Sequence, residues 1–363
     1  MPHPVATHSS TVHLGTASPH IHYLSPFLPN STYTFYRGTT RYMLLWSNYV
    51  LTFPEETFGR PAIFKSVDEG ETWTGPLDPD NAPVLDKNFL QGSPCYDYRF
   101  AAAGDVGINP ALASSVTAMF KTAVSLEWDF ADFAFSGESW GAPYGTVTGV
   151  GGGSAFHFAS APNGNRVYAI QTATPTVVGA PTVGTAPELA VDASSDAHYG
   201  ADGGTPGFSL TENSGNVRIH NGKLYFPRIK AGVLEVLSRP LGSSTWTAET
   251  VGSVSNPDRS TRVPWLYNPR TVYWIDTTSY DKVYRSKKSG TWGDPVQVWS
   301  FADDTNPDLG DNLGINSLCV SRNPVVGGVD ISFHCDGFFE GYGEAVLTFN
   351  SPLSEAANRY YGA

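Results

Sequence analysis

Aromatic, amide and guanidinium side chains gather in the segment VPWLYNPR at residues 263–270. The rings of Trp265 and Tyr267 can stack on the apolar faces of pyranose sugars, and Asn268 and Arg270 can hydrogen-bond sugar hydroxyls. This pattern predicts a glycan-binding loop between two strand-like runs. The alternative is that Trp265 and Tyr267 pack in the interior of the fold.

Histidine and aspartate side chains offer metal or acid–base chemistry elsewhere. His20 and His22 are two residues apart, so both rings would lie on one face of a strand. A structural pair is the favoured interpretation, because no third ligand stands at a metal-binding spacing. The run DAHYGADGG at 196–204 has oxygen ligands suited to Ca²⁺ but no regular spacing, so an ordinary acidic loop is favoured. The sequence therefore predicts no metal and no cofactor.

The sharpest local pattern is SVDEGETW at residues 66–73. Its signature residues are Ser66, Asp68, Gly70, Thr72 and Trp73. Asp68 can accept hydrogen bonds from the backbone amides of its own turn, and Gly70 supplies a position with positive φ. The pattern predicts a β-hairpin whose side chains have a structural role.

Weaker copies of this pattern recur, each after an extended apolar run. They are SGESW at 136–140, SRPLGSSTW at 238–246 and SKKSGTW at 286–292, where Lys288 occupies the place of the aspartate. Repeats of about 40–60 residues with short strands indicate a propeller rather than a sandwich.

The four segments resemble the Asp boxes (BNR repeats) of sialidase-like β-propellers. NSGNVRIHNGKLYFP at 213–227 also resembles a sialidase segment of strand, glycine turn and strand. The spacing of the motifs resembles that family over most of the chain, but individual residues match only in these short segments. It implies an all-β fold of four-stranded antiparallel blades, six for a chain of 363 residues, with seven as the alternative.

The chain departs from the catalytic pattern of the family that it resembles. His20-Ile21-His22 stands in place of an Arg-Ile-Pro motif, the segment at 261–276 has no Glu, and Asn316 stands in place of the tyrosine nucleophile. We therefore expect no sialidase mechanism and assign no catalytic residue. Arg262 and Asn316 join the glycan-binding candidates through this alignment.

Composition and length limit the remaining possibilities. The net charge is −12 and no Lys/Arg cluster stands out, so a nucleic-acid partner is not expected. No run of about 18 apolar residues could insert into a membrane, and the start MPHPVATHSS does not resemble a signal peptide. Cys319 and Cys335 could be cross-strand neighbours, although two buried thiols are favoured. We expect a polar N-terminal arm at 1–18 and a single propeller domain at 19–363.

Together these observations favour a non-catalytic glycan- or receptor-binding propeller outside the cell. It would be a surface protein, or an attachment protein (tail, fibre or spike) on a virus particle with other virion proteins as partners. One alternative is a secreted carbohydrate-active enzyme, either a glycoside hydrolase or a polysaccharide lyase. The other is a purely structural virion protein.

Overall fold

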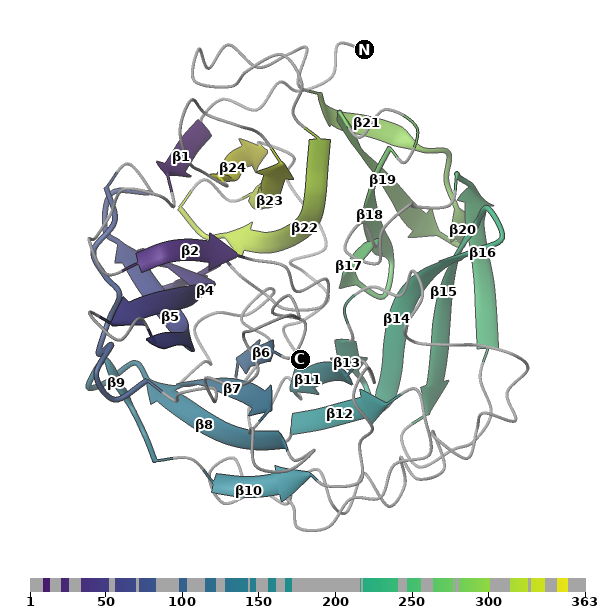
Figure 1. Ribbon diagram of the computed structural model, residues 1–363. Coiled ribbons are helices and arrows are strands. Elements are labelled where there is room, and N and C mark those ends of the chain that lie inside the picture. The colour runs from purple at the N-terminus through teal and green to yellow at the C-terminus, as the bar shows by residue number, and fades with distance from the viewer. Residues whose placement is uncertain are drawn as a thin grey trace.

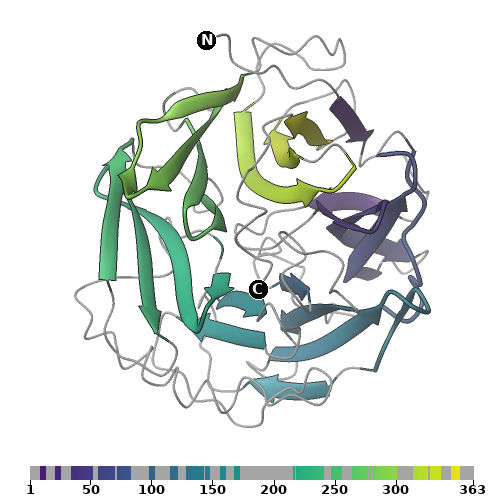
Figure 2. The same cartoon turned by 180° about the vertical axis from the view of Figure 1, so that it is seen from behind.

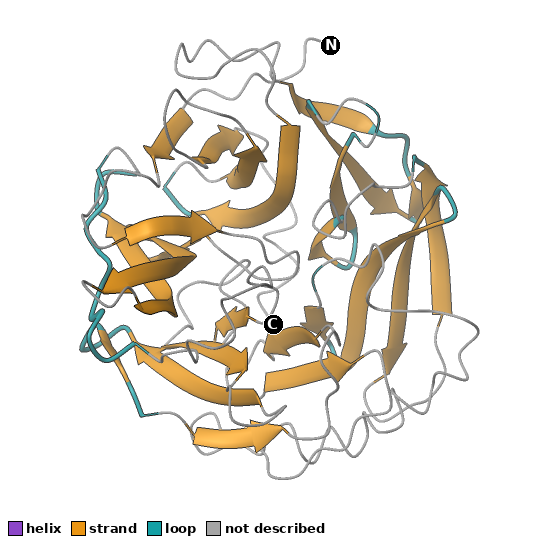
Figure 3. Cartoon of the chain, in the orientation of Figure 1, coloured by secondary structure: helices purple, strands orange, loops and turns teal. Residues whose placement is uncertain are grey.

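A computed structural model gives the fold, and all regular elements in the part of the chain that it describes are strands, with no helix (Figure 3). The described residues are 9–13, 21–25, 34–51, 56–69, 72–82, 98–102, 115–121, 128–142, 144–147, 156–160, 167–171, 216, 218–240, 247–255, 264–276, 278, 281–300, 314–325, 328–336 and 345–351. Gly70 and Arg262 lie outside them.

The strands form six antiparallel sheets, which we number I to VI along the chain. Sheet I contains β2 (Ile21–Ser25), β3 (Thr34–Arg37), β4 (Thr40–Leu51) and β5 (Glu56–Ser66). Sheet II contains β6 (Tyr98–Ala102), β7 (Ser115–Lys121), β8 (Trp128–Ala134), β9 (Ser139–Trp140) and β10 (Tyr144–Val147). Sheet III contains β11 (Phe156–Ser160) and β12 (Val167–Gln171).

Sheets IV and V follow β12, and sheet VI completes the set. Sheet IV contains β13 (Arg218–His220), β14 (Lys223–Lys230), β15 (Val233–Pro240) and β16 (Thr247–Ser253). Sheet V contains β17 (Trp265–Asn268), β18 (Thr271–Ile275), β19 (Lys282–Ser289), β20 (Thr291–Trp292) and β21 (Val296–Ser300). Sheet VI contains β22 (Gly314–Asn323), β23 (Gly328–Asp336), β24 (Ala345–Ser351) and β1 (Ser9–His13).

The six sheets follow one another around a common centre, as both views of the ribbon show (Figures 1 and 2). In sheets II, IV and V the first strand lies nearest to this centre and later strands lie farther out (Figure 1). The described fold is therefore all-β, as predicted, and a closed propeller of six blades stays a prediction.

The position of a strand within its sheet determines whether polar and apolar residues alternate along it. All residues of β17 and β18 are buried, whereas β16 at the outer edge of sheet IV is mostly exposed or half-buried. An inner strand that is covered on both faces shows no alternation of polar and apolar residues. For this reason WLYN, expected to be a loop, is strand β17.

The chain start differs from the predicted polar arm, because β1 pairs antiparallel with β24. Ser9 lies opposite Phe349 and His13 lies opposite Ala345. An edge strand is held chiefly by main-chain hydrogen bonds, so the polar composition of residues 9–13 gave no sign of it. The two ends of the described chain thus belong to one sheet.

The register of sheet VI separates the two C-terminal cysteines. Cys319 on β22 lies opposite Ser332, and Cys335 on β23 lies opposite Ile315, so the two are not cross-strand neighbours. Cys319 is a buried thiol in no disulfide, and its Sγ donates to the carbonyl oxygen of Thr34 at 3.7 Å. It therefore packs sheet VI against sheet I.

Candidate functional site

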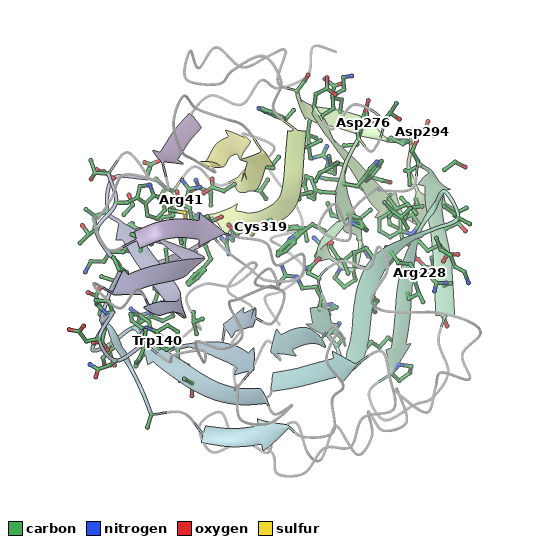
Figure 4. The ribbon with its side chains drawn as sticks, in the orientation of Figure 1. Arg41, Trp140, Arg228, Asp276, Asp294 and Cys319 are labelled. Carbon is green, nitrogen blue, oxygen red and sulfur yellow. The ribbon has the colours of Figure 1, made fainter. Side chains whose placement is uncertain are left out.

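The surface between sheets IV and V gathers aromatic rings, two cations and a carboxylate from strands that are far apart in sequence. We call this the IV–V seam and define it by Tyr225, Glu249, Arg270, Lys288 and Trp292. Figure 4 shows the dense set of side chains where β14, β16, β19 and β20 meet.

Beneath the seam, an apolar cluster fixes the two sheets against each other. Buried residues from sheet IV meet buried residues from sheet V, and Tyr225 and Trp292 pack against this cluster from its edge. The buried members are Ile229, Leu234, Val236, Leu266, Val272 and Trp274. Because close-packed interiors resist deformation, the seam side chains above the cluster are held by rigid elements.

Glu249 is the central polar group of the seam. Lys288 Nζ donates to its Oε2 at 2.5 Å, and the Trp292 indole Nε1 donates to the same oxygen at 3.2 Å. Its side chain is 39% exposed. Among the described residues, both hydrogen bonds to Glu249 are made to Oε2, and Oε1 can accept hydrogen bonds from ligand hydroxyls.

Tyr225 and Arg270 complete the polar lining. Burial raises the pKa of the Tyr225 phenol, the charge of Glu249 raises it further, and Arg270 opposes the shift. Tyr225 is half-buried and Arg270 is exposed. The seam can therefore present a neutral phenol, a guanidinium and a carboxylate beside two partly exposed rings, which suits a polyhydroxylated ligand with apolar faces.

The hairpin between β17 and β18 places Arg270. Asn268 Oδ1 accepts from the Arg270 amide at 2.8 Å, a local turn bond that asparagine readily forms. The Arg270 carbonyl in turn accepts from the Lys288 amide at 2.8 Å. These backbone contacts hold Arg270 and Lys288 at the same end of sheet V.

The other glycan-binding candidates lie elsewhere. The side chains of Trp265, Tyr267 and Asn268 are at most 2% exposed. The rings of Trp265 and Tyr267 therefore pack in the interior of the fold, which was the alternative to a glycan-binding loop. Asn316 lies at the register shift between Ile315 and Ser317 in β22. Of the candidates, the described structure brings only Arg270 to the seam.

Trp265 is fixed by contacts that leave no ring face for a sugar. Its Nε1 donates to the Val320 carbonyl at 3.0 Å, and the Arg218 guanidinium lies over its ring at 5.6 Å. Arg218 Nε and Asn216 Nδ2 donate to the Leu266 carbonyl at 3.0 and 2.8 Å. Trp265 thus joins sheet V to sheet VI and to the inner strand of sheet IV.

Four of the five seam residues were not predicted as binding residues: Tyr225, Glu249, Lys288 and Trp292. A usable signal was the replacement of the box aspartate by Lys288, because a lysine there cannot accept bonds from turn amides and must find an anion elsewhere. Glu249 itself stands in no recognisable motif.

Among known proteins, this chain is similar to several solved structures. No protein-family model matches the chain, and a search of curated proteins found no match. One similar solved structure is a fungal lectin from Aleuria aurantia, which is described as a six-bladed β-propeller with a novel fucose recognition mode. Its sequence is 14% identical to this chain. The alignment covers 97% of this chain and 98% of that chain, with a TM-score of 0.43.

Two further structures are similar to this chain. A sialidase is 11% identical over 96% of this chain and 33% of that chain, with a TM-score of 0.45. The β-propeller domain of the Trilobed protease from Pyrococcus furiosus is 8% identical over 89% of this chain and 84% of that chain, with a TM-score of 0.36. What these proteins recognise or cleave is a property of those proteins.

The hairpin at 66–73 has the predicted geometry where it is described. Asp68 Oδ1 accepts from the Ser66 hydroxyl at 2.6 Å and from the Thr72 amide at 2.9 Å, and Oδ2 accepts from the Thr72 hydroxyl at 2.5 Å. Hydrogen bonds from Ser66 and Thr72 hold the pKa of Asp68 well below its usual range. All of these bonds stay within the turn, as expected for a structural motif.

A second polar cluster lies between sheets I and VI but is closed to ligands. Arg41 on β4 and Asp330 on β23 form an ion pair of 3.1 Å with side chains at most 1% exposed. Arg41 Nη1 donates to the Glu69 carbonyl at 3.0 Å, and Asn323 Nδ2 donates to Asp330 Oδ1 at 2.8 Å. Arg41 and Cys319 lie where these two sheets meet (Figure 4).

In the described part of the chain, no helix is long and apolar enough to cross a membrane. Within the same part of the chain, no group of three His, Cys, Asp or Glu side chains is placed to hold a metal ion.

Proposed function

We propose that this chain is a non-catalytic glycan-binding β-propeller that binds a sugar at the IV–V seam. In this proposal the six sheets are the blades of a closed ring, and β1 completes the last blade beside β24. The protein acts outside the cell, as a surface protein or as the attachment protein of a virus particle that recognises a receptor glycan.

The observation that carries the proposal is the arrangement around Glu249. Its Oε2 is held by Lys288 and Trp292, while Tyr225 and Arg270 lie beside it at the surface. Sugars bind where partly exposed rings stand next to fixed hydrogen-bonding groups of both polarities.

The same arrangement favours binding over hydrolysis. Most glycoside hydrolases place two carboxyl groups about 5–10 Å apart across the scissile bond. The five seam residues include one carboxylate, Glu249. A seam of this composition can hold a sugar in place but lacks the paired acid and base.

A glycan array with the purified chain tests this proposal. Arg270→Ala should weaken binding of each recognised glycan by about 10- to 100-fold, the equivalent of a lost charge-assisted hydrogen bond. Arg37→Ala is the matched control, because Arg37 is also an exposed arginine beside the first hairpin of a sheet. Equal binding by wild type and Arg270→Ala would contradict the assignment of the seam.

Catalysis is tested on the same glycans by assays for reducing ends and for unsaturated uronates. Release of either product by the wild type would refute a purely binding role and favour the enzyme alternative. Absence of both binding and turnover across the array would favour a structural virion protein.

A further inference from the structure

Basic residues are distributed very unevenly along this acidic chain. Residues 218–292, which contain sheet IV and most of sheet V, hold twelve of the 22 Lys and Arg residues but five of the 34 Asp and Glu residues. This stretch therefore has seven excess positive charges, and the remainder of the chain has nineteen excess negative charges. Nine of these twelve basic residues lie on four strands, β13, β14, β15 and β19, and they are not contiguous in sequence, so the excess appears only when the whole stretch is counted.

Several of these charges lie at the seam end of the two sheets. Lys223 is exposed at the start of β14, two residues before Tyr225. Arg270 is exposed in the turn between β17 and β18, and Lys288 is half-buried on β19. Among the described residues at this end, the acids are Glu249, which is paired with Lys288, and Asp294, which is exposed after β20.

From this charge pattern we infer that the seam binds an anionic polysaccharide, one with carboxylate or sulfate groups along a chain of sugars. This inference rests on the proposed glycan-binding function and names its ligand class. Lys and Arg side chains at the seam attract the anionic groups, while Glu249 Oε1 accepts from sugar hydroxyls. The negative remainder of the protein repels the polyanion and so confines it to the seam.

A nucleic acid fits the same cations less well. Glu249 needs hydrogen-bond donors from the ligand, and a phosphodiester backbone presents acceptors where a polysaccharide presents hydroxyls. A long nucleic acid would also meet the negative remainder of the chain.

Binding of defined polymers to the full chain tests the inference. The probes are alginate for carboxylates, heparin for sulfates, carboxyl-reduced alginate and dextran as neutral polymers, and double-stranded DNA, each titrated at 50 and 300 mM NaCl. We expect alginate or heparin to bind, with affinity falling steeply at the higher salt because exposed charges are screened. Whichever of the two binds identifies the anionic group.

Paired variants assign the binding to the seam. Lys223→Gln combined with Arg270→Gln should weaken polyanion binding by about tenfold at low salt, if each exposed charge contributes as much as a typical surface ion pair. Lys230→Gln is the control, because Lys230 is an exposed lysine of sheet IV in the hairpin at the other end of β14. Equal loss in the control would refute a seam-specific site.

The remaining outcomes distinguish failure of the anionic ligand class from failure of the proposed glycan-binding function. Binding of dextran or carboxyl-reduced alginate as tight as that of the polyanions would refute an anionic ligand and leave glycan binding intact. Binding of DNA at least as tight as that of alginate and heparin would refute the polysaccharide assignment. No binding of any polymer, together with a silent glycan array, would overturn both.

Discussion

The buried pair of Arg41 and Asp330 gives the sharpest test of how the first and last sheets are joined. Both side chains are at most 1% exposed, and their ion pair of 3.1 Å spans β4 of sheet I and β23 of sheet VI. Removing one member of a buried ion pair leaves an uncompensated charge and typically costs about 3–5 kcal/mol. We therefore expect Asp330→Asn and Arg41→Met each to lower the free energy of unfolding by about that amount.

The double variant distinguishes this mechanism from simple loss of packing. Arg41→Met with Asp330→Leu replaces both charges by apolar groups of similar size, which is often close to neutral for a buried pair. The double variant should therefore be more stable than either single variant. The measurement is urea unfolding followed by circular dichroism, with linear extrapolation to water and comparison of slopes.

An exposed pair supplies the matched control. Lys65 on β5 and Glu138 in the β8–β9 turn also join neighbouring sheets, with a separation of 2.5 Å, but their side chains are 28% and 34% exposed. Solvent screens such a pair, so Lys65→Met should cost at most about 1 kcal/mol. Single changes at Arg41 or Asp330 that cost no more than Lys65→Met would refute the argument from burial.

Two more expectations concern the turns at the end of sheet I. Because hydrogen bonds lower the pKa of Asp68, its stabilising effect is present above the ordinary aspartate pKa of about 4 and is lost as pH falls below that value. The difference in melting temperature between wild type and Asp68→Asn should therefore shrink between pH 7 and pH 3, and a constant difference would contradict the assigned bonds. Gly75→Ala should cost more than about 3 kcal/mol, because its φ is +149° and a Cβ there would lie 2.7 Å from Phe64 Cδ1 and 2.9 Å from the Ile63 carbonyl oxygen. Gly38→Ala, with φ of +63° and open space around it, should cost only about 1 kcal/mol in the same urea experiment.

Strands with a strong local pattern could be predicted from the sequence. The segment 213–227, expected to form a strand, a glycine turn and a second strand, contains β13 and the first part of β14. The hairpin at 66–73 was predicted from the hydrogen-bonding capacity of Asp68 and the conformational freedom of Gly70. These features depend on residues close together in the chain, so their physics is visible in the sequence.

Features that depend on contacts between sheets could not be predicted in the same way. Glu249 and Lys288 are separated by 39 positions, and only the packing of sheet IV on sheet V brings them together. Trp265 has the residue type of a sugar-stacking ring, yet its Nε1 bond to Val320 places it in the interior. Residue type states what a side chain can do, and packing decides which side chains reach solvent.

The third position of the recurring hairpin motif shows how a structural repeat can acquire a second role. In SVDEGETW this position is Asp68, which bonds Ser66 and Thr72 of its own turn. In SGESW it is Glu138, which pairs with Lys65 of sheet I, and in SKKSGTW it is Lys288, which pairs with Glu249 of sheet IV.

These departures from aspartate are therefore not simple decay of the motif. Glu138 and Lys288 are longer than aspartate, so each can leave its turn and reach the neighbouring sheet. At the IV–V seam this contact also holds one oxygen of Glu249 and leaves the other for a ligand. The recurring hairpin motif thus also positions, through Lys288, the carboxylate on which the proposed sugar site depends.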